Sequence, residues 1–458
     1  MGSATYDFSR KPIPVPPVET KFRTIKTPIP CEGTDELICE LEKYESRSMQ
    51  GQIPIIWDRA EDFNVYDIAG NKWIDFTSTI FVTNCGHGNP EVIKAVKKVL
   101  DKPLLHTYAY ANKERVEYLK ALIEFAGNGF EKAFLLSAGT EATEAAVKLM
   151  RMHGQKTNPG KVGVICIEGN WHGRTMGAQM LSSNVQQKEW VGYTDPNIFH
   201  IPFPYPWDER SPEEIFNEGI NSLKSKGIDF RKDICGVMLE TFQGWGAVFY
   251  PKEYVKLMEK FCRENDILLT FDEMQSGFAR TGKKFGYELY EVKADLLCVG
   301  KGMGGGFSIS GVIGKTEIMD LPEIGNMSST HSANPVVCSA AKASLDYITE
   351  NNLVEKTFEK GKLFHEELNK IKEQFSEQIS YVLGEGLLAA IHFKNPKNNE
   401  PDGLFASKLS ELCMQKGLLV VHTGRESVKL APPLTICTEA LLEGIEVIRE
   451  AMIELNED

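Results

Sequence analysis

Short runs of consecutive apolar residues alternate with longer segments of helical period through the middle of the chain. A run that is apolar at every position is typical of a strand buried on both faces, as in parallel sheets. Such runs predict strands at 162–167, 236–239, 267–271, 296–299 and 309–313. Apolar residues at helical spacing in 140–152 and 253–264 predict helices between some of these strands. The alternation indicates an α/β domain with a mostly parallel central sheet that helices cover on both faces.

The two ends of the chain follow a different pattern. Residues 1–30 are rich in proline and predict an extended arm. Beyond about residue 345, charged helical segments such as 354–375 flank short strand patterns such as 387–393, which predicts a smaller α+β domain. We therefore expect an arm and part of the small domain in 1–75, a large ligand-binding domain in 76–345, and the remainder of the small domain in 346–458.

Composition narrows the possible functions. Of the 458 residues, 42% are apolar and 25% are charged, as in ordinary globular proteins. The net charge of −13 argues against nucleic-acid binding as the main function, because such surfaces are basic. The chain begins without an apolar signal core and lacks an apolar run of the roughly 18 residues that a transmembrane helix needs. We expect a cytoplasmic protein with neither a membrane nor a nucleic acid as partner.

The ten cysteines form no CxxC pair. Several of them, including Cys166, Cys235, Cys298 and Cys437, lie within apolar stretches. We expect reduced residues of the core, not a disulfide framework or a zinc site, and this agrees with a cytosolic location. The sequence predicts no metal site.

Lys301 lies directly between an apolar run, 295–300, and a glycine-rich segment, 302–306. Desolvation at the end of a buried strand lowers the pKa of a lysine, and a neutral amine condenses with aldehydes. The glycines leave room for a flat ligand to approach the backbone. The same segment is compatible with an ordinary lysine whose stem reaches solvent, so by itself it leaves both interpretations open.

A second candidate is the segment 137–142, in which small residues precede the strong helical pattern of 140–152. The free N–H groups and the positive dipole end of a helix bind anions, and phosphate suits such a site best. The Thr140 hydroxyl adds a further donor. The alternative is an ordinary helix cap formed by Ser137 or Thr140.

Asp272 and Glu273 follow the predicted strand 267–271, at the edge where open α/β sheets bind ligands. An aspartate there is suited to a cationic ring nitrogen or to a magnesium ion. Nucleotide binding through magnesium lacks support, because the segment 311–316 matches only the end of a Walker loop. Ile309 stands where the leading glycine of that loop is needed.

Trp171 and His172 follow the predicted strand 162–167 and offer a flat ring and a hydrogen-bonding group. Such a pair alone is more often structural. Together with Lys301, Asp272 and the anion segment, however, they complete a set: an imine-forming amine, an acid for a ring nitrogen, a phosphate site and a stacking ring. Pyridoxal 5′-phosphate (PLP) requires all four, so the sequence predicts this cofactor.

From about Tyr44 to its C-terminus the chain resembles the class III, or ornithine/4-aminobutyrate-type, aminotransferases of PLP fold type I. The resemblance rests on an aspartate motif, a lysine motif, a phosphate loop, a ring-stacking loop, a segment that reaches the neighbouring subunit, and two segments beside the substrate. In that order they are 270–283, 301–306, 138–142, 171–175, 330–335, 240–246 and 429–434. The resemblance implies a large domain with a mostly parallel sheet and a smaller α+β domain built from the N- and C-terminal segments.

The resemblance also implies roles around the cofactor. Lys301 would form the Schiff base and move a proton between the substrate Cα and the cofactor, and Asp272 would keep the ring nitrogen protonated. The other implied cofactor-binding residues are Gly139 and Thr140 at the phosphate, Trp171 and His172 at the ring, Gln275 at the 3′-oxygen, and Thr330 at the phosphate of the neighbouring subunit. Because Thr330 would act across subunits, we expect a homodimer with composite active sites.

Five residues are expected beside the substrate: Ile80, Phe81, Glu240, Trp245 and Lys429. Lys429 stands where family members that use glutamate often have arginine, and Trp245 stands where they often have the glutamate that pairs with it. Lys429 lacks the bidentate fork of an arginine, and Arg425 is an alternative partner for a substrate carboxylate. The side chains of Ile80, Phe81 and Trp245 predict an aromatic and bulkier pocket.

We predict a PLP-dependent aminotransferase that moves an amino group from an amine or amino acid to an aldehyde or keto acceptor. The mechanism would be ping-pong, through pyridoxamine phosphate. The alternatives on the same fold are an aminomutase, a racemase or a decarboxylase, and a non-catalytic binding protein is a further alternative. The sequence identifies neither the donor nor the acceptor.

Overall fold

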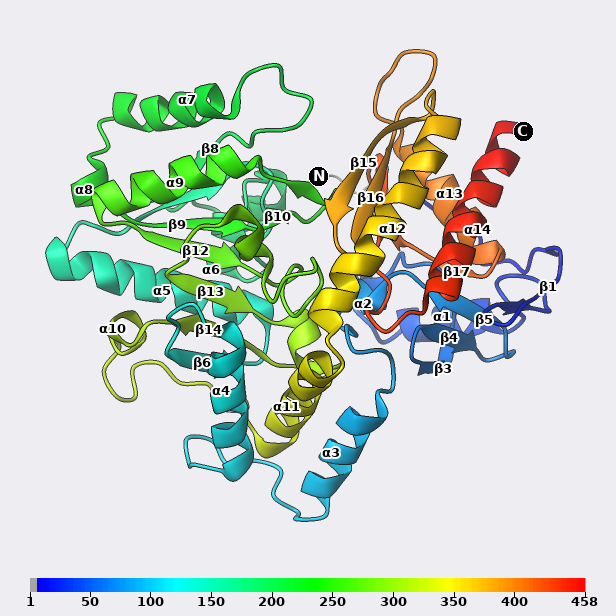
Figure 1. Ribbon diagram of the computed structural model, residues 1–458, viewed down its shortest axis with the longest axis horizontal. Helices are drawn as coiled ribbons and strands as arrows, with labels where there is room; N and C mark the ends of the chain where they lie inside the picture. Colours follow the sequence, from blue (N-terminus) through cyan, green and yellow to red (C-terminus); the bar gives the residue numbers. More distant parts are fainter. Residues whose placement is uncertain (1–5, 458) are drawn as a thin grey trace. The chain divides into compact units, whose positions relative to one another are not determined.

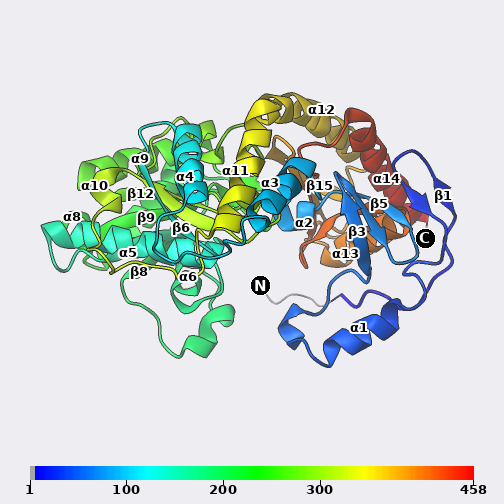
Figure 2. The same ribbon diagram turned by 90° about the horizontal axis from the view of Figure 1, so that it is seen from below.

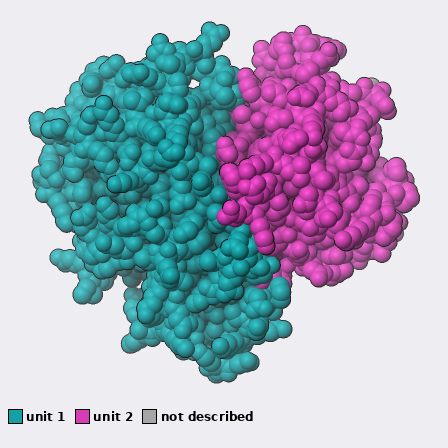
Figure 3. All heavy atoms as spheres, in the orientation of Figure 1, with its two compact units in different colours: residues 1, 90–244, 248–354 teal, residues 2–89, 245–247, 355–458 magenta. Residues whose placement is uncertain are grey.

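The computed structural model describes residues 6–457, whose elements Figure 1 labels. The chain divides into two compact units, coloured separately in Figure 3. Unit 1 consists of residues 90–244 and 248–354. The described residues of unit 2 are 6–89, 245–247 and 355–457.

Unit 1 is built on a central sheet of seven strands among its described residues, in the order β6-β14-β13-β12-β9-β7-β8. Strand β14 is antiparallel to both of its neighbours, and the remaining neighbours pair in parallel. The predicted mostly parallel sheet is therefore confirmed. The strands are β6 (Lys132–Leu136), β7 (Gly163–Ile167), β8 (Ile198–Ile201), β9 (Ile234–Glu240), β12 (Leu268–Asp272), β13 (Leu296–Val299) and β14 (Ser310–Gly314).

All residues of the five inner strands are buried, which explains why their sequences read as uninterrupted apolar runs. The pattern did not predict the two edge strands, β6 and β8, because edge strands are only partly buried. A short hairpin, β10 (Phe242–Gln243) with β11 (Val248–Phe249), follows β9.

Helices cover both faces of this sheet. Helix α5 (Gly139–Thr157) packs through Ala142, Ala146 and Leu149 against the inner strands. Figure 2 shows the sheet between α5 on one side and α4 and α9 on the other. The other helices of unit 1 are α3 (Pro90–Leu100), α4 (Lys113–Ala126), α6 (Met176–Leu181), α7 (Pro212–Ser225), α8 (Phe230–Asp233), α9 (Lys252–Asn265), α10 (Thr316–Met319) and α11 (Pro335–Glu350), with 3-10 turns η2 (Gln186–Val191), η3 (Gly286–Tyr290) and η4 (Lys301–Gly304).

Unit 2 contains two sheets. In the first, β17 (Leu418–Leu419) from the C-terminal part pairs with β5 (Lys72–Asp75) from the N-terminal part. The proline-rich segment predicted as an arm contributes β1 and β2 to this sheet, and the first five residues of that prediction lie outside the described residues. The order is β1 (Val18–Glu19), β2 (Thr24–Ile25), β5, β4 (Asn64–Asp67) and β3 (Trp57–Glu61).

The second sheet of unit 2 has the order β15 (Ile379–Glu385), β16 (Leu388–Phe393), β19 (Ser427–Leu430) and β18 (Val421–His422), with antiparallel pairing. The small α+β unit is thus formed by both ends of the chain, as the family resemblance implied. Its helical segments are α1 (Thr34–Glu42), η1 (Arg47–Met49), α2 (Ser78–Phe81), α13 (Gly403–Gln415), α14 (Thr438–Glu457) and most of α12 (Leu353–Gln374).

The cysteines and the lengths of the helices can be compared with the expectations from the sequence. The ten cysteines are all free, and Cys166, Cys235 and Cys298 are buried in the core. Cys437 is half-buried, so the expectation of a core residue does not hold for it, and Cys39 is exposed. Between residues 6 and 457, no helix combines the length and the apolar character needed to cross a membrane.

Candidate active site

The carboxyl ends of the parallel strands in unit 1 open into a cavity of about 280 Å³. Strands β9 and β12 end at Glu240 and Asp272, which are register partners on adjacent strands. Lys301 follows β13 after one intervening glycine. Eight residues predicted for the site line this cavity: Gly139, Thr140, Trp171, His172, Glu240, Asp272, Gln275 and Lys301.

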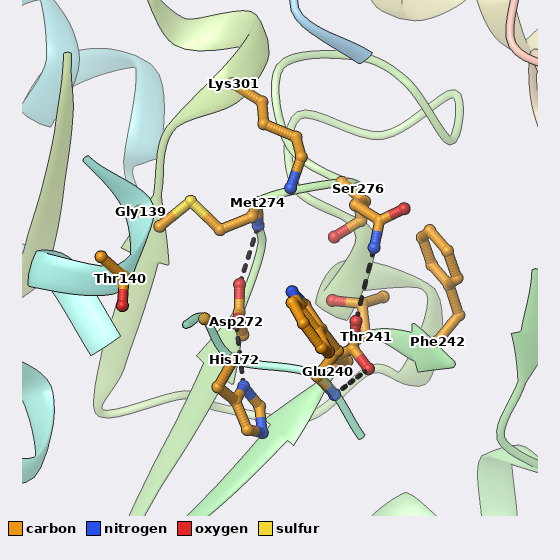
Figure 4. A pocket seen from close by; sticks show the side chains of 13 residues that line it. Gly139, Thr140, His172, Glu240, Thr241, Phe242, Asp272, Met274, Ser276 and Lys301 are labelled. Carbon is orange, nitrogen blue, oxygen red and sulfur yellow. Dashed lines mark hydrogen bonds and ion pairs between the residues drawn. The ribbon is translucent and has the colours of Figure 1, made fainter. Parts of the chain in front are cut away.

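Lys301 extends its side chain into the cavity, toward Asp272 and Glu240 (Figure 4). Burial lowers the pKa of the Lys301 amine, and the negative charge of Asp272, joined by that of Glu240 when it is ionised, opposes this shift. A lowered pKa increases the fraction of neutral amine, which is the nucleophilic form. The Lys301 backbone has φ 44°, in the left-handed region that is uncommon for a residue with a side chain and recurs at functional sites.

Asp272 is buried, and both of its carboxylate oxygens are held. Its Oδ2 lies 2.9 Å from His172 Nδ1, and its Oδ1 accepts a hydrogen bond of 3.1 Å from the Met274 N–H. The His172 backbone is fixed in turn, because its N–H donates to Ser182 Oγ and its carbonyl accepts from Thr143 Oγ1. The structure therefore places His172 as a residue that orients Asp272 from beneath the cavity (Figure 4).

Glu240 is the second buried carboxyl of the cavity. Burial, with the neighbouring charge of Asp272, raises the pKa of Glu240 to about 8. Its Oε2 accepts a hydrogen bond of 2.9 Å from the Trp171 N–H, and its Oε1 lies 3.5 Å from Gln275 Nε2. Glu240 is accordingly protonated over much of the neutral range and links the stacking loop to Gln275.

Glu273, adjacent in sequence to Asp272, does not line the cavity. Its carboxylate accepts four hydrogen bonds of 2.6 to 2.8 Å, from Thr241 Oγ1, Ser276 Oγ and the N–H groups of Gly286 and Tyr287. Successive side chains at a strand end point to opposite sides, so only one of the two acids reaches the cavity. Glu273 holds the surrounding loops together.

The start of helix α5 forms another wall of the cavity. Ala138 at the N-cap has no side-chain acceptor, and within the described chain the N–H groups of Gly139 and Thr140 have none either. Glu141 caps the preceding residues instead, by accepting from the N–H groups of Ser137 and Ala138 at 2.9 Å each. A Cβ on Gly139 would lie 2.8 Å from Met274 Sδ, so a larger residue there would displace the Met274 side chain. Free N–H groups at a helix N-terminus suit a phosphate.

These features match the requirements of PLP. A buried lysine of lowered pKa, a fixed carboxylate, an aromatic side chain and a free helix N-terminus line one cavity. Met274, Thr241, Ser276 and Phe242 also line it and were not predicted. The sequence signal for them was their position beside the strand-end acids, in segments already assigned to the site.

Thr330 does not line the cavity of its own chain. It is exposed, and its carbonyl oxygen lies 2.7 Å from His106 Nε2. This placement leaves Thr330 available to another chain and does not bring it to the other predicted cofactor residues.

The other four residues predicted to lie beside the substrate, Ile80, Phe81, Trp245 and Lys429, belong to unit 2. Phe81 is buried and lies under the Lys429 ammonium, whose Nζ is 4.8 Å from the ring centroid, while Ile80 is 47% exposed. The Arg425 guanidinium stacks over the Trp245 ring, with its Cζ 3.5 Å from the ring centroid. Arg425 is also hydrogen-bonded to Glu426 at 3.1 and 3.2 Å, which neutralises its charge.

Comparison with known proteins supplies an independent line of evidence. A family described as Aminotransferase class-III matches residues 46–452. A mitochondrial acetylornithine aminotransferase from Candida glabrata is 32% identical over 424 residues, covering 91% of this chain and 94% of that protein. An alanine/serine racemase from Pyrococcus horikoshii is 29% identical, covering 97% and 96%. The crystal structure of a Bacillus anthracis aminotransferase has a TM-score of 0.84 and 25% identity, covering 94% of this chain and all of that one.

Proposed function

The chain belongs to the class III aminotransferases, PLP-dependent enzymes that move amino groups between amines and carbonyl compounds, and we propose that the cavity of unit 1 is where it does so. Lys301 and Asp272 are the catalytic residues of this proposal. When bound, PLP supplies an aldehyde that condenses with amines and a cationic ring that accepts electron density. The residues around the cavity supply binding, orientation and proton transfer.

Lys301 provides the proton-transfer group. Its amine enters the cavity with a lowered pKa, so it can take a proton from the substrate Cα and return it. Asp272 carries a negative charge that favours a proton on the ring nitrogen, and His172 at 2.9 Å keeps the carboxylate in position. Glu240 adds no second negative charge near neutral pH, since its pKa is raised to about 8.

Binding of the cofactor is assigned to the walls of the cavity. The N–H groups of Gly139 and Thr140 would hold the phosphate, and Trp171 and Gln275, which also line the cavity, would bind the ring and its oxygen. Glu240 of unit 1 is proposed to face the substrate. Within unit 2, the residues proposed for the substrate are Ile80, Phe81, Trp245 and Lys429. Lys429 is the residue proposed for a substrate carboxylate, and Arg425, which is hydrogen-bonded to Glu426, is the alternative.

The observation that carries this proposal is that the Lys301 amine and the fixed Asp272 carboxylate enter one cavity beside a free helix N-terminus. The test supplies a panel of amines to the PLP-loaded protein without an acceptor and follows the long-wavelength absorbance of the bound cofactor. An aminotransferase loses this absorbance and releases one carbonyl product per site. A racemase, the activity named for one relative, regains its absorbance and inverts the amine.

Replacement of the lysine gives the sharpest test. Lys301→Ala should lower the turnover by at least about a thousandfold, because it removes the nucleophile and the proton carrier together. Lys315→Ala, at an exposed lysine of the same unit, is the matched control and should keep normal turnover. Normal turnover in Lys301→Ala would overturn the proposed site.

We infer a homodimer in which Thr330 completes the site of the partner. The segment that precedes α4 exposes several large apolar side chains to solvent, and His106 ties this segment to the Thr330 carbonyl. Exposed apolar residues in that number favour burial against a second chain. They are Leu100, Leu104, Leu105, Tyr108 and Tyr110.

Hybrid dimers test the composite site. In a dimer of one Lys301→Ala chain and one Thr330→Val chain, a composite arrangement gives one site with both native residues and one with both changes. The hybrid should then contain one PLP site of native affinity. If Thr330 acted within its own chain, no native site would form in the hybrid.

The cytoplasm is the compartment we propose. The ten cysteines of the described chain are free, and buried thiols persist unpaired in a reducing compartment. Fractionation with a thiol-labelling assay checks this assignment.

A further inference from the structure

One face of helix α5 binds the loop that carries Trp171 and His172. Glu144 Oε1 accepts three hydrogen bonds from this loop: 2.5 Å from Thr175 Oγ1, 2.9 Å from the Gly177 N–H and 3.1 Å from the Ala178 N–H. One turn earlier, Thr140 Oγ1 lies 2.5 Å from Thr175 Oγ1. Thr140 therefore lines the cavity and also contacts a solvent-exposed network that leads to a carboxylate.

The contact is close on both sides of Thr140. Gly173, in the same loop, has φ 142°, and a Cβ there would lie 2.4 Å from Thr140 Oγ1. A glycine at position 173 therefore leaves room for the Thr140 hydroxyl at its contact with Thr175.

The number of protons fixes the direction of this network. Each hydroxyl has one proton to donate, and a carboxylate can only accept. Thr175 must donate to Glu144, so it has no proton for Thr140. The 2.5 Å contact between the two hydroxyls then requires Thr140 to donate to Thr175. The Thr140 proton is thereby used, and its oxygen presents lone pairs to the cavity.

We propose that Glu144, acting through Thr175, is a positioning residue that turns the Thr140 hydroxyl proton away from the cofactor phosphate. The inference rests on the proposed function of the cavity. The phosphate is then held by backbone N–H groups at the start of α5 and gains nothing from the Thr140 hydroxyl. This differs from the sequence expectation, in which that hydroxyl was a further donor.

A double-mutant cycle on the full-length enzyme tests the direction of the network. Thr175→Val keeps the shape of the side chain but removes the acceptor, which frees the Thr140 proton for the phosphate. We expect the dissociation constant of PLP to fall roughly tenfold, as for a hydrogen bond to a charged group. Thr140→Val in the native background should change it less than about twofold, whereas in the Thr175→Val background it should remove the gain.

Pyridoxal, which lacks the phosphate, is the matched ligand. Its affinity should be the same in the native enzyme and in Thr175→Val, because only phosphate binding is affected. If Thr175 only maintained the shape of the loop, Thr175→Val would change the affinities of both PLP and pyridoxal. Glu144→Gln keeps an acceptor oxygen and removes the charge, so it should shift PLP affinity in the same direction by a smaller factor.

Two results would overturn the inference while leaving the proposed function in place. One is a weaker PLP affinity in Thr175→Val with unchanged pyridoxal affinity, since Thr175 would then aid phosphate binding. The other is a loss of tenfold or more for Thr140→Val in the native background. If the native protein binds neither ligand, the proposed function itself fails, and the inference fails with it.

Discussion

The cofactor-side residues of unit 1 and the substrate-side residues of unit 2 are held by different means. In unit 1 the side chains extend from the ends of regular buried strands, and hydrogen bonds fix their charges, as between Asp272 and His172. In unit 2, Ile80 and Phe81 lie on α2, in which four consecutive non-glycine residues have φ between 45° and 69°. Each such residue costs about 1–2 kcal/mol relative to ordinary backbone.

The strained turn of unit 2 persists because its neighbours hold it. The Thr77 N–H donates to Asp75 Oδ1 at 2.7 Å, and Ser78 Oγ donates to the Ala431 carbonyl at 2.6 Å. Asp75 Oδ2 in turn lies 2.7 Å from His87 Nε2. The comparison teaches that Asp272 is positioned by a regular buried strand, whereas Ile80 and Phe81 lie on backbone that only tertiary contacts can hold.

The largest expected effect is a difference in turnover between alanine variants of two adjacent acidic residues in unit 1. Asp272→Ala should lower turnover by roughly a thousandfold or more, several kcal/mol in the barrier, with a smaller loss of fold stability than Glu273→Ala, since it leaves two donors without a partner and not four. Glu273→Ala should mainly lower the free energy of unfolding, by about 3 kcal/mol or more, since it leaves four buried donors unsatisfied. Steady-state kinetics and urea unfolding of both variants provide the check. Equal kinetic losses would remove the distinction.

The second prediction concerns pH and the cofactor-free protein. Folding raises the pKa of Glu240 to about 8 from an ordinary value of 4.5. The folded state therefore binds this proton more tightly than the unfolded state does, and protonation of Glu240 contributes to the free energy of unfolding. This contribution is complete below pH 4.5 and is lost as the pH rises toward 8, by at most about 1.4 kcal/mol per pH unit. Glu240→Gln, which imitates the protonated form, should abolish this part of the pH dependence of the unfolding free energy. An unchanged slope would contradict the assignment.

A third prediction compares two cations of unit 2. Lys429→Ala should raise KM for an acidic substrate about tenfold more than KM for a neutral amine, as expected when one ion pair is lost. Arg425→Ala should not discriminate between the two substrates, because Glu426 already pairs with this guanidinium. The reverse result would transfer the carboxylate site to Arg425.

The smallest effect probes the strained turn directly. Ile80→Gly and Ile80→Ala both remove an exposed side chain, but only glycine accepts φ 61° without a steric penalty. Glycine should therefore be more stable than alanine at this position by about 1 kcal/mol in urea unfolding. If the side chain sets substrate choice, both variants should also lose discrimination between amines. Greater stability of the alanine variant would show that the turn is not strained.

Much of the fold of unit 1 could be predicted from the sequence. Uninterrupted apolar runs located the inner strands to within a residue or two, since strands buried on both faces tolerate little polarity. Residues that follow such strands must lie at one edge of the sheet, so Asp272 and Lys301 could be assigned to one site before any contact was known.

Other assignments needed the folded chain. Strand position alone does not distinguish Asp272 from Glu273; the family resemblance selected Asp272, and the course of the strand end brings it and not Glu273 into the cavity. His172 lines the cavity, as expected for a residue at the cofactor, and only the folded chain shows its contact with Asp272. The position of Glu144 against Thr175, 31 residues apart in the chain, follows from helix α5 packing beside the loop.

Local pattern alone determined the type of element, the residues that are buried and the chemical groups gathered at the sheet edge, because these depend on hydrophobicity and on the period of strand and helix. Tertiary structure decided the left-handed course of residues 78–81, the direction of the hydroxyl network and the neutral state of Glu240. Each of these depends on which distant atoms surround a group. Desolvation, hydrogen-bond direction and steric support are properties of that surrounding and are not encoded in any single segment.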